Sequence, residues 1–177
     1  MRKRIFTSLL AIAMVMAMIP AALAEEPWRV EVSNGINFTK NTTQEDLDQW
    51  AEGAVTLSVS EDQSSYTFTL NKDIRLADNA NNPLTFGIFD YGEGKGETPI
   101  MILDLNGHTV DGKLTVVANM GNLVIRDSIG TGRIVLDNRN SYMTAVQNAG
   151  YKLTIEGGTF TGDVKLQNSA GNTVSTL

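Results

Sequence analysis

The sequence feature that most restricts the fold is a phrase that recurs in the second half of this 177-residue chain. It occupies residues 116–125, 145–155 and 165–174, which read VVANMGNLVI, AVQNAGYKLTI and KLQNSAGNTV. Each copy has an apolar stretch, an Asn, a Gly and a second β-prone stretch. The repeated asparagines lie 29 and then 20 residues apart, at positions Asn119, Asn148 and Asn168. Such spacing is typical of proteins whose repeats stack on their neighbours, so it predicts a chain built of stacked units.

The first 24 residues have the pattern of a secretory signal peptide. A basic start is followed by an apolar stretch over residues 5–19 and by small residues up to Ala24. This order predicts cleavage between Ala24 and Glu25. The alternative is an uncleaved membrane anchor, although the 19 residues from 5 to 23 are barely enough to span a bilayer. No second long apolar stretch follows, so we expect an exported protein whose mature chain does not span a membrane.

The charge of the mature chain excludes some classes of binding partner. After removal of the signal peptide, 153 residues remain, with 11 Lys and Arg against 20 Asp and Glu, a net charge of −9. Phosphate groups would repel such a chain, so we expect no nucleic-acid partner. Cysteine is absent, so disulfide bonds contribute nothing and stability must come from packing and hydrogen bonds. A chain of this length is expected to form one domain.

Residues 25–53 are predicted to form an N-terminal segment that contains a short helix near residues 43–52. Thr43 and Asp46 have the spacing of a capping box, and Gly53 stands where a helix would stop. From residue 54 onward the alternation of apolar and polar residues indicates strands. It is clearest over residues 55–59 and 66–76, and a period of two is the pattern of a half-buried strand.

The later strands suggest how the units stack. Leu103, Leu123 and Leu153 each begin a similar strand, and Gly-rich or polar turns follow. Unequal spacings of 20 and 30 residues suit a right-handed parallel β-helix of about three to four coils over residues 54–177, in which some coils carry longer loops. A propeller blade would need about four antiparallel strands in 40 or more residues. A β-sandwich remains the serious alternative.

The segments 103–110, 123–134 and 153–162 resemble a broad family of secreted bacterial surface proteins with a right-handed β-helix of the pectin-lyase-like type, often described as adhesin-like. The resemblance covers roughly residues 43–177. It implies a secreted or cell-surface protein that takes part in adhesion or in glycan contact. Members of this family are usually longer, whereas this chain stops at Leu177 within a strand-like segment. We therefore expect a fragment truncated at its C-terminal end, or an end covered by another copy through end-to-end self-association.

Enzymes of this fold use clustered acids and bases, so the charged residues of the strands and turns are candidates for catalysis. The acids are Asp104, Asp111, Asp127, Asp137 and Asp163, and the bases are Lys113, Arg126, Arg133 and Lys165. Asp104 and Arg126 are expected to be neighbours, because adjacent coils lie about 4.8 Å apart. A solvated row of opposite charges explains such a pair more simply than catalysis does. The prediction is a non-catalytic protein, with a polysaccharide lyase, a glycoside hydrolase or an inactive carbohydrate-binding relative as the alternative.

The remaining polar residues are better explained by structure than by chemistry. His108 is the only histidine, and one histidine without cysteines is not expected to hold zinc. Residues 78–82 offer oxygen ligands that could hold calcium, but an Asx-rich turn is the simpler interpretation. The repeated asparagines are predicted to stack into a hydrogen-bonded ladder.

The ligand contacts that we predict are aromatic. Tyr142 and Tyr151 lie in or near a loop, where their rings could stack on a sugar of a glycan ligand. We expect no metal and no cofactor. The sequence thus predicts a secreted or cell-surface structural or adhesive module whose partner is a glycan or a surface protein.

Overall fold

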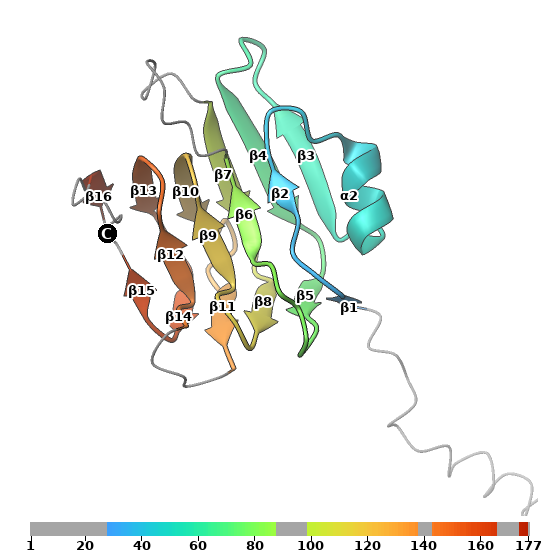
Figure 1. Ribbon diagram of the computed structural model, residues 1–177. Helices are drawn as coiled ribbons and strands as arrows, with labels where there is room; N and C mark the ends of the chain where they lie inside the picture. The colour runs from blue at the N-terminus through green and yellow to red at the C-terminus, as the bar shows by residue number, and fades with distance from the viewer. Residues whose placement is uncertain (1–27, 88–98, 138–142, 166–173, 177) are drawn as a thin grey trace, which may run out of the picture.

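The structure, a computed structural model, describes residues 28–87, 99–137, 143–165 and 174–176. Within these ranges the chain is mainly β: its strands form three sheets, and a single helix, α2 (Gln44–Ala51), lies at one end (Figure 1). The predicted signal peptide and its cleavage site between Ala24 and Glu25 lie outside the described residues.

Strands that are distant in the sequence lie side by side in each of the three sheets. Sheet A contains β1 (Arg29–Val32), β5 (Asp73–Leu76), β8 (Thr109–Gly112), β11 (Arg133–Leu136) and β14 (Thr159–Thr161) in that order. Sheet B contains β2 (Asn37–Phe38), β6 (Leu84–Phe86), β9 (Val117–Asn119), β12 (Val146–Asn148) and β15 (Val164–Lys165). Sheet C contains β3 (Val55–Val59), β4 (Ser65–Leu70), β7 (Ile100–Asp104), β10 (Asn122–Arg126), β13 (Lys152–Ile155) and β16 (Val174–Thr176).

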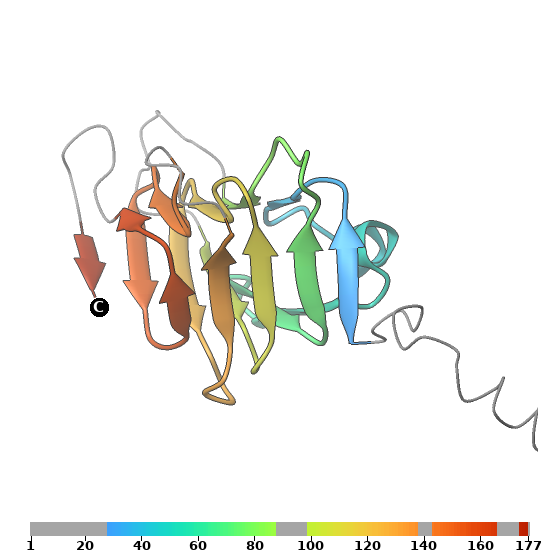
Figure 2. The same ribbon diagram turned by 90° about the horizontal axis from the view of Figure 1, so that it is seen from below.

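The order of the strands is periodic. From β4 onward the chain passes through sheets C, A and B in turn, so that β4–β6, β7–β9, β10–β12 and β13–β15 form four successive levels, as Figure 2 shows from below. Neighbouring levels pair in parallel, and β3–β4 is the one antiparallel pair among the described strands. Sandwiches of the immunoglobulin type consist of antiparallel sheets, so this pairing argues against the sandwich alternative.

The core fills the space between the three sheets. In sheet C one inward row contains Tyr66, Met101, Leu123 and Leu153, in register across four strands. A second row contains Phe68, Leu103 and Ile125, all of which are fully buried. Full burial of one such side chain contributes about 1.5–3 kcal/mol. The predicted alternation of the strands therefore places their apolar side in one continuous core.

One predicted strand start is wrong. Leu123 and Leu153 are each the second residue of their strands and pair with each other, whereas Leu103, also predicted to begin its strand, is the fourth residue of β7. Leu103 pairs with Ile125, and the partner of Leu123 in β7 is Met101, which is the register that makes Asp104 and Arg126 neighbours. A shift of two residues keeps the same side chains on the inner face, so alternation alone cannot distinguish the two registers.

The predicted helix is confirmed and has the predicted cap. The Thr43 hydroxyl accepts a hydrogen bond from the backbone N–H of Asp46 at 3.2 Å, and the Asp46 carboxylate accepts one from the N–H of Thr43 at 2.8 Å. Leu47 and Ala51 are buried on one side of the helix. The Trp50 indole donates to the carbonyl of Asn34 at 2.8 Å. These contacts hold α2 against the first strands.

The first strand of sheet C departs from the predicted pattern at one end. Val55 is buried as expected, but Leu57 is half-buried and Val59 is 42% exposed. Because β3 forms the edge of sheet C, one of its sides has no neighbour among the described strands. Helix α2 contacts the Val55 end through Gln44, so burial decreases along the strand away from that end.

The recurring Asn and Gly form a corner between sheets B and C. Asn119 donates from Nδ2 to Oδ1 of Asn148 at 2.8 Å and to the carbonyl of Lys152 at 2.8 Å. Its own Oδ1 accepts from the N–H of Gly121 at 2.9 Å. A Cβ on Gly150 would lie 2.4 Å from the nitrogen of Gly121, so no larger residue fits there. The predicted ladder is confirmed for these two asparagines, while Asn168 lies outside the described residues.

Candidate functional site

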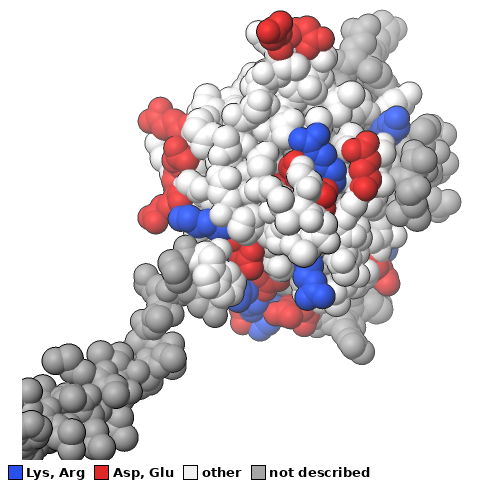
Figure 3. Space-filling model, turned by 180° about the vertical axis from the view of Figure 1, so that it is seen from behind, with Lys and Arg blue, Asp and Glu red and all other residues white. Residues whose placement is uncertain are grey.

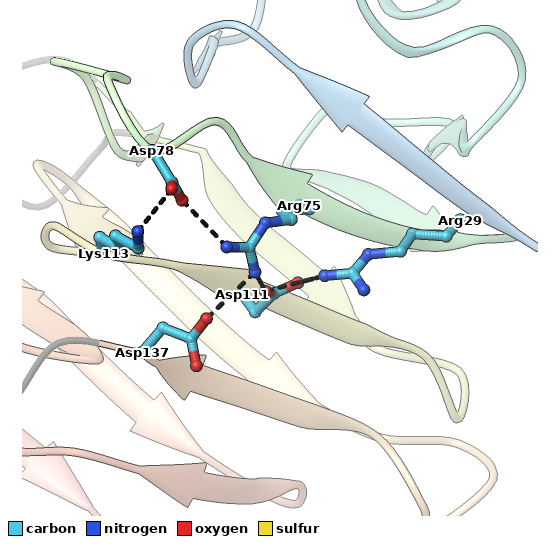
Figure 4. A network of polar contacts seen from close by, with 6 residues as sticks. All are labelled: Arg29, Arg75, Asp78, Asp111, Lys113 and Asp137. Carbon is cyan, nitrogen blue, oxygen red and sulfur yellow. Dashed lines mark hydrogen bonds and ion pairs between the residues drawn. The ribbon is translucent and has the colours of Figure 1, made fainter. Parts of the chain in front are cut away.

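Six charged side chains form a network on the outer face of sheet A (Figure 4). They are Arg29, Arg75, Asp78, Asp111, Lys113 and Asp137. Arg75 and Asp111 are direct neighbours in β5 and β8, and they alternate with the buried Ile74 and Val110. The alternation that builds the core therefore also directs these charges outward.

Asp111 lies between two arginines. Nη2 of Arg29 donates to both of its carboxylate oxygens, at 2.8 and 2.9 Å, and Arg75 donates to one of them. Arg29 is in β1, and β5 lies between β1 and β8 in the sheet. The Arg29 side chain therefore reaches across one strand and joins the first strand of the sheet to the third.

Arg75 contacts three carboxylates. Besides Asp111, it donates to Asp137 at 3.1 Å and to Asp78 at 3.0 Å. The hydrogen bond to Asp137, together with the charge of Asp111 and the hydrogen bonds to Asp78 and Asp111, raises the pKa of Arg75 above its ordinary value despite the partial burial of the guanidinium. Arg75 therefore remains protonated. It is the cation that binds these three carboxylates, and it does not act as a base.

Asp78, the first residue of the segment 78–82 considered for calcium, closes the network. It pairs with both Lys113 and Arg75, and the hydrogen bond from Lys113 is the main cause that lowers its pKa. The N–H of Asn81 donates to the side chain of Asn34 at 2.8 Å, as in an Asx-rich connection. In the described part of the chain no group of three acidic or histidine side chains is placed to hold a metal ion.

Asp104 and Arg126 are neighbours, as predicted, but they are not a solvated pair. Nε of Arg126 lies 2.9 Å from Oδ2 of Asp104, and the Asp104 side chain is only 4% exposed. The hydroxyl and the N–H of Ser128 and the N–H of Asn106 also donate to this carboxylate. Burial alone would raise the pKa of Asp104, yet these hydrogen bonds outweigh it and lower the pKa. The expectation of a solvated row of charges is wrong here, because the turns after β7 and β10 surround the Asp104 carboxylate with hydrogen-bond donors.

Asp127 has a similar structural environment. Its carboxylate accepts from the N–H of Gly107 at 2.8 Å and from the N–H of Gly132 at 2.6 Å. Burial would raise the pKa of Asp127, but the backbone N–H groups outweigh it and lower the pKa. Gly107 follows β7 and Gly132 precedes β11. Asp127 therefore ties together the turns of two successive levels.

The structure does not gather the remaining predicted acids and bases at this network. Arg133, Asp163 and Lys165 are exposed on β11, in the turn before β15 and on β15. His108 lies at a turn, as predicted, and its Nδ1 is 3.1 Å from the carboxylate of Asp73. The described charged residues thus lie in three places: the network of sheet A, the turns that bind Asp104 and Asp127, and the exposed surface.

Tyr151 is available for contact with a ligand. It is 51% exposed and directly precedes β13, where its N–H donates to the carbonyl of Gly121 at 2.9 Å. Lys152 beside it is also exposed. Tyr142, the second predicted ligand contact, lies outside the described residues. Seen from behind, most of the surface is uncharged, and the charged side chains lie in small groups, several of which contain both acidic and basic residues (Figure 3).

Sequence reasoning missed Arg29 and Arg75, which complete the network. The signal was present, because each arginine stands between apolar residues of a β-prone segment and so points outward. The ion-pair partners of these arginines could not be recognised from the sequence, because Arg29 and Asp111 are 82 positions apart. Only the register of β1, β5 and β8 brings them together.

Comparisons with known proteins identify no family for this chain. No family model, no curated protein and no solved structure matches the chain. Among the described residues no helix is long and apolar enough to cross a membrane.

Proposed function

We propose that residues 54–177 form a right-handed parallel β-helix of three to four coils, with residues 25–53 as its helix-containing N-terminal segment. The repeated passage through sheets C, A and B supports this architecture, since each level returns to the strand beside which it began. Crossover connections between parallel strands are right-handed in about 98% of cases, which supports the handedness.

We further propose that the protein is exported to the cell surface and acts there as a non-catalytic structural or adhesive module. The observation that carries the proposal is that three of its acids are engaged in hydrogen bonds between levels. Asp104, Asp111 and Asp127 are each held by hydrogen bonds that join separate strands or turns. The lowered pKa values of Asp104 and Asp127 make these two carboxylates poor general acids, and Asp111 is held between two arginines. These residues therefore serve the stacking of the levels.

The proposed ligand is a glycan or the surface of a neighbouring cell or protein, and Tyr151 is its proposed contact. An exposed aromatic ring offers a flat apolar face on which a sugar ring can stack, and its hydroxyl remains free to form hydrogen bonds with water or with sugar hydroxyls. Lys152 beside it can donate hydrogen bonds to sugar hydroxyls, and a neutral glycan suits a mature chain of net charge −9 better than an acidic one. A single ring implies weak binding, so adhesion would depend on several copies acting together.

A binding assay tests the adhesive role. The mature protein, displayed in many copies on beads, is applied to a panel of plant, mucin-type and bacterial glycans and to whole cells. We expect retention on at least one class, and Tyr151→Ala should reduce it about tenfold. Ile129→Ala, which alters a 66% exposed residue in another turn, is the matched control. Equal retention of both variants would remove Tyr151 from the site, and absence of retention on every surface would overturn the adhesive role.

The enzymatic alternative is a polysaccharide lyase or hydrolase, and the network of sheet A is the feature that favours it. Three acids and two arginines on one sheet face are the residue types that such chemistry needs. Incubation with pectic and mucin-type glycans, with and without calcium, tests it. Unsaturated products or new reducing ends that Asp111→Asn abolishes would overturn the non-catalytic proposal.

A further inference from the structure

Strand β3 is the outermost strand of sheet C and pairs only with β4 among the described strands. The carbonyl of Ala54 and the N–H of Ser60 bond to Asn71 and Ser65 on the β4 side. By the two-residue alternation of an antiparallel pair, the backbone groups of Val55 and Leu57 face away from β4.

The side chain of Gln44 occupies this edge. Its Nε2 donates to the carbonyl of Val55 at 2.8 Å, and its Oε1 accepts from the N–H of Leu57 at 2.8 Å. In a parallel pair, the N–H and C=O of one residue contact two residues of the neighbouring strand that are two positions apart. The carboxamide of Gln44 therefore reproduces the contacts that one residue of an added strand would make.

The position of this carboxamide is fixed by the helix. Gln44 is the first residue of α2 and lies between Thr43 and Asp46, which form the capping box. Its Nε2 also donates to Asp48 at 3.0 Å, one helical turn away. The side chain is thus held at both its base and its tip.

We propose that Gln44 blocks the edge of sheet C and prevents β3 from pairing with β3 of a second copy of this chain. An unpaired edge strand offers a template for another chain. A contact between two β3 strands would be self-complementary and so would close as a twofold dimer. Thr56 and Ser58 on the outer face of β3 carry no charge that would oppose it. Gln44 occupies the backbone atoms that such a contact needs.

The experiment compares Gln44→Ala with Gln49→Ala. Gln49 is on the same helix, and its amide contacts only Glu45 among the described partners, at 3.4 Å. Sedimentation velocity over a wide range of protein concentrations measures the association of each variant. We expect Gln44→Ala to associate at least about tenfold more tightly than the wild type, the order of effect of releasing strand hydrogen bonds, and Gln49→Ala to match the wild type. A folded Gln44→Ala that associates no more than Gln49→Ala would overturn the proposal.

Two further variants locate the contact. If Gln44→Ala fails to fold by circular dichroism, Gln44→Met serves in its place, because it keeps the length of the side chain and its helix propensity but can make neither bond. Since the chain has no cysteine, Thr56→Cys together with Ser58→Cys in the same background reports where two copies meet, because a twofold antiparallel pairing centred on residue 56, 57 or 58 brings two of these cysteines opposite each other. A disulfide-linked dimer is expected where β3 strands pair. Association without this cross-link would overturn the assignment to β3.

Discussion

The row of inward side chains in sheet B changes its chemistry between β6 and β9. Phe38 and Phe86 are in register in the first part, and the positions aligned with them in the later strands are Asn119 and Asn148. All four side chains are buried. The same position in successive strands is thus filled by aromatic rings near the helix and by amides further from it.

The aromatic part is filled by contacts between rings. The rings of Phe38 and Phe86 stack at 4.4 Å, and Phe68 packs edge-on against Phe38 at 4.7 Å. Trp50 of α2 contacts the edge of this group at 5.8 Å from Phe38. Apolar contact has no directional requirement, so a helix can cover such a row as well as another strand can.

The amide part depends on directional bonds between levels. Asn119 donates to Asn148 of the next level and to the carbonyl of Lys152. A buried amide that loses such partners costs about 1–3 kcal/mol. Apolar rings thus fill this row in the part of the sheet next to the helix, and directional amide bonds fill it in the later levels.

Replacing a ring at the centre of the aromatic part should have the largest effect. Phe86→Ala removes a fully buried side chain that touches Phe38 and Phe68. The cavity should lower the free energy of unfolding by about 4 kcal/mol. Urea denaturation of the mature protein measures it. A loss below that of Asn119→Ala would contradict the idea that this part of the molecule depends mainly on apolar packing.

The buried acid of the polar levels should come next and should depend on pH. Asp104→Asn leaves Arg126 and Ser128 without their carboxylate partner, which should cost about 3 kcal/mol at neutral pH. The folded pKa of Asp104 lies below its ordinary value of 3.8. Its contribution is therefore present above about pH 4 and is lost as the pH falls through the lower folded value. Urea titrations at pH 7 and pH 3 should show a smaller difference between wild type and variant at pH 3, and a constant difference would contradict this account.

Breaking the amide ladder should have a smaller effect. Asn119→Ala leaves Asn148, Lys152 and Gly121 without one hydrogen bond each, at a cost of about 2 kcal/mol. Hydrogen exchange at Gly121 should increase. Gln147→Ala, which changes an exposed neighbour on β12, is the control and should be close to neutral. Equal effects of the two variants would show that the ladder contributes nothing to stability.

The surface network should contribute least. Arg75→Ala removes three ion pairs, but its side chain is 22% exposed and two of its three acids are about half exposed. Water weakens such pairs, so the expected loss is about 1 kcal/mol and should shrink at high salt. Arg133→Ala, on the same sheet, provides the comparison. A loss as large as that of Phe86→Ala would mean that the network, and not the aromatic core, fixes the first strands.

The local elements could be predicted because their causes are local. Thr43, Asp46 and Gly53 mark the ends of the helix, and the alternation of apolar residues marks the strands. The Asn ladder was also predictable, since stacking of equivalent corners follows from the repeat. The network of sheet A was not predictable, because Arg29 and Asp111 meet only when three separate strands are placed in register. The burial of Asp104 was missed for a related reason: it depends on Ser128, which belongs to the next level.

The sequence by itself therefore determined a mainly β chain with one capped helix and a repeated Asn–Gly corner, because hydrogen-bonding turns, caps and alternation act over a few residues. The tertiary structure decided the register of Leu103, the partners of the charged residues and the closure of the β3 edge by Gln44. These features depend on contacts between residues far apart in the chain. A shift of two residues leaves the apolar pattern intact but changes every such contact, so only the assembled sheets could fix them.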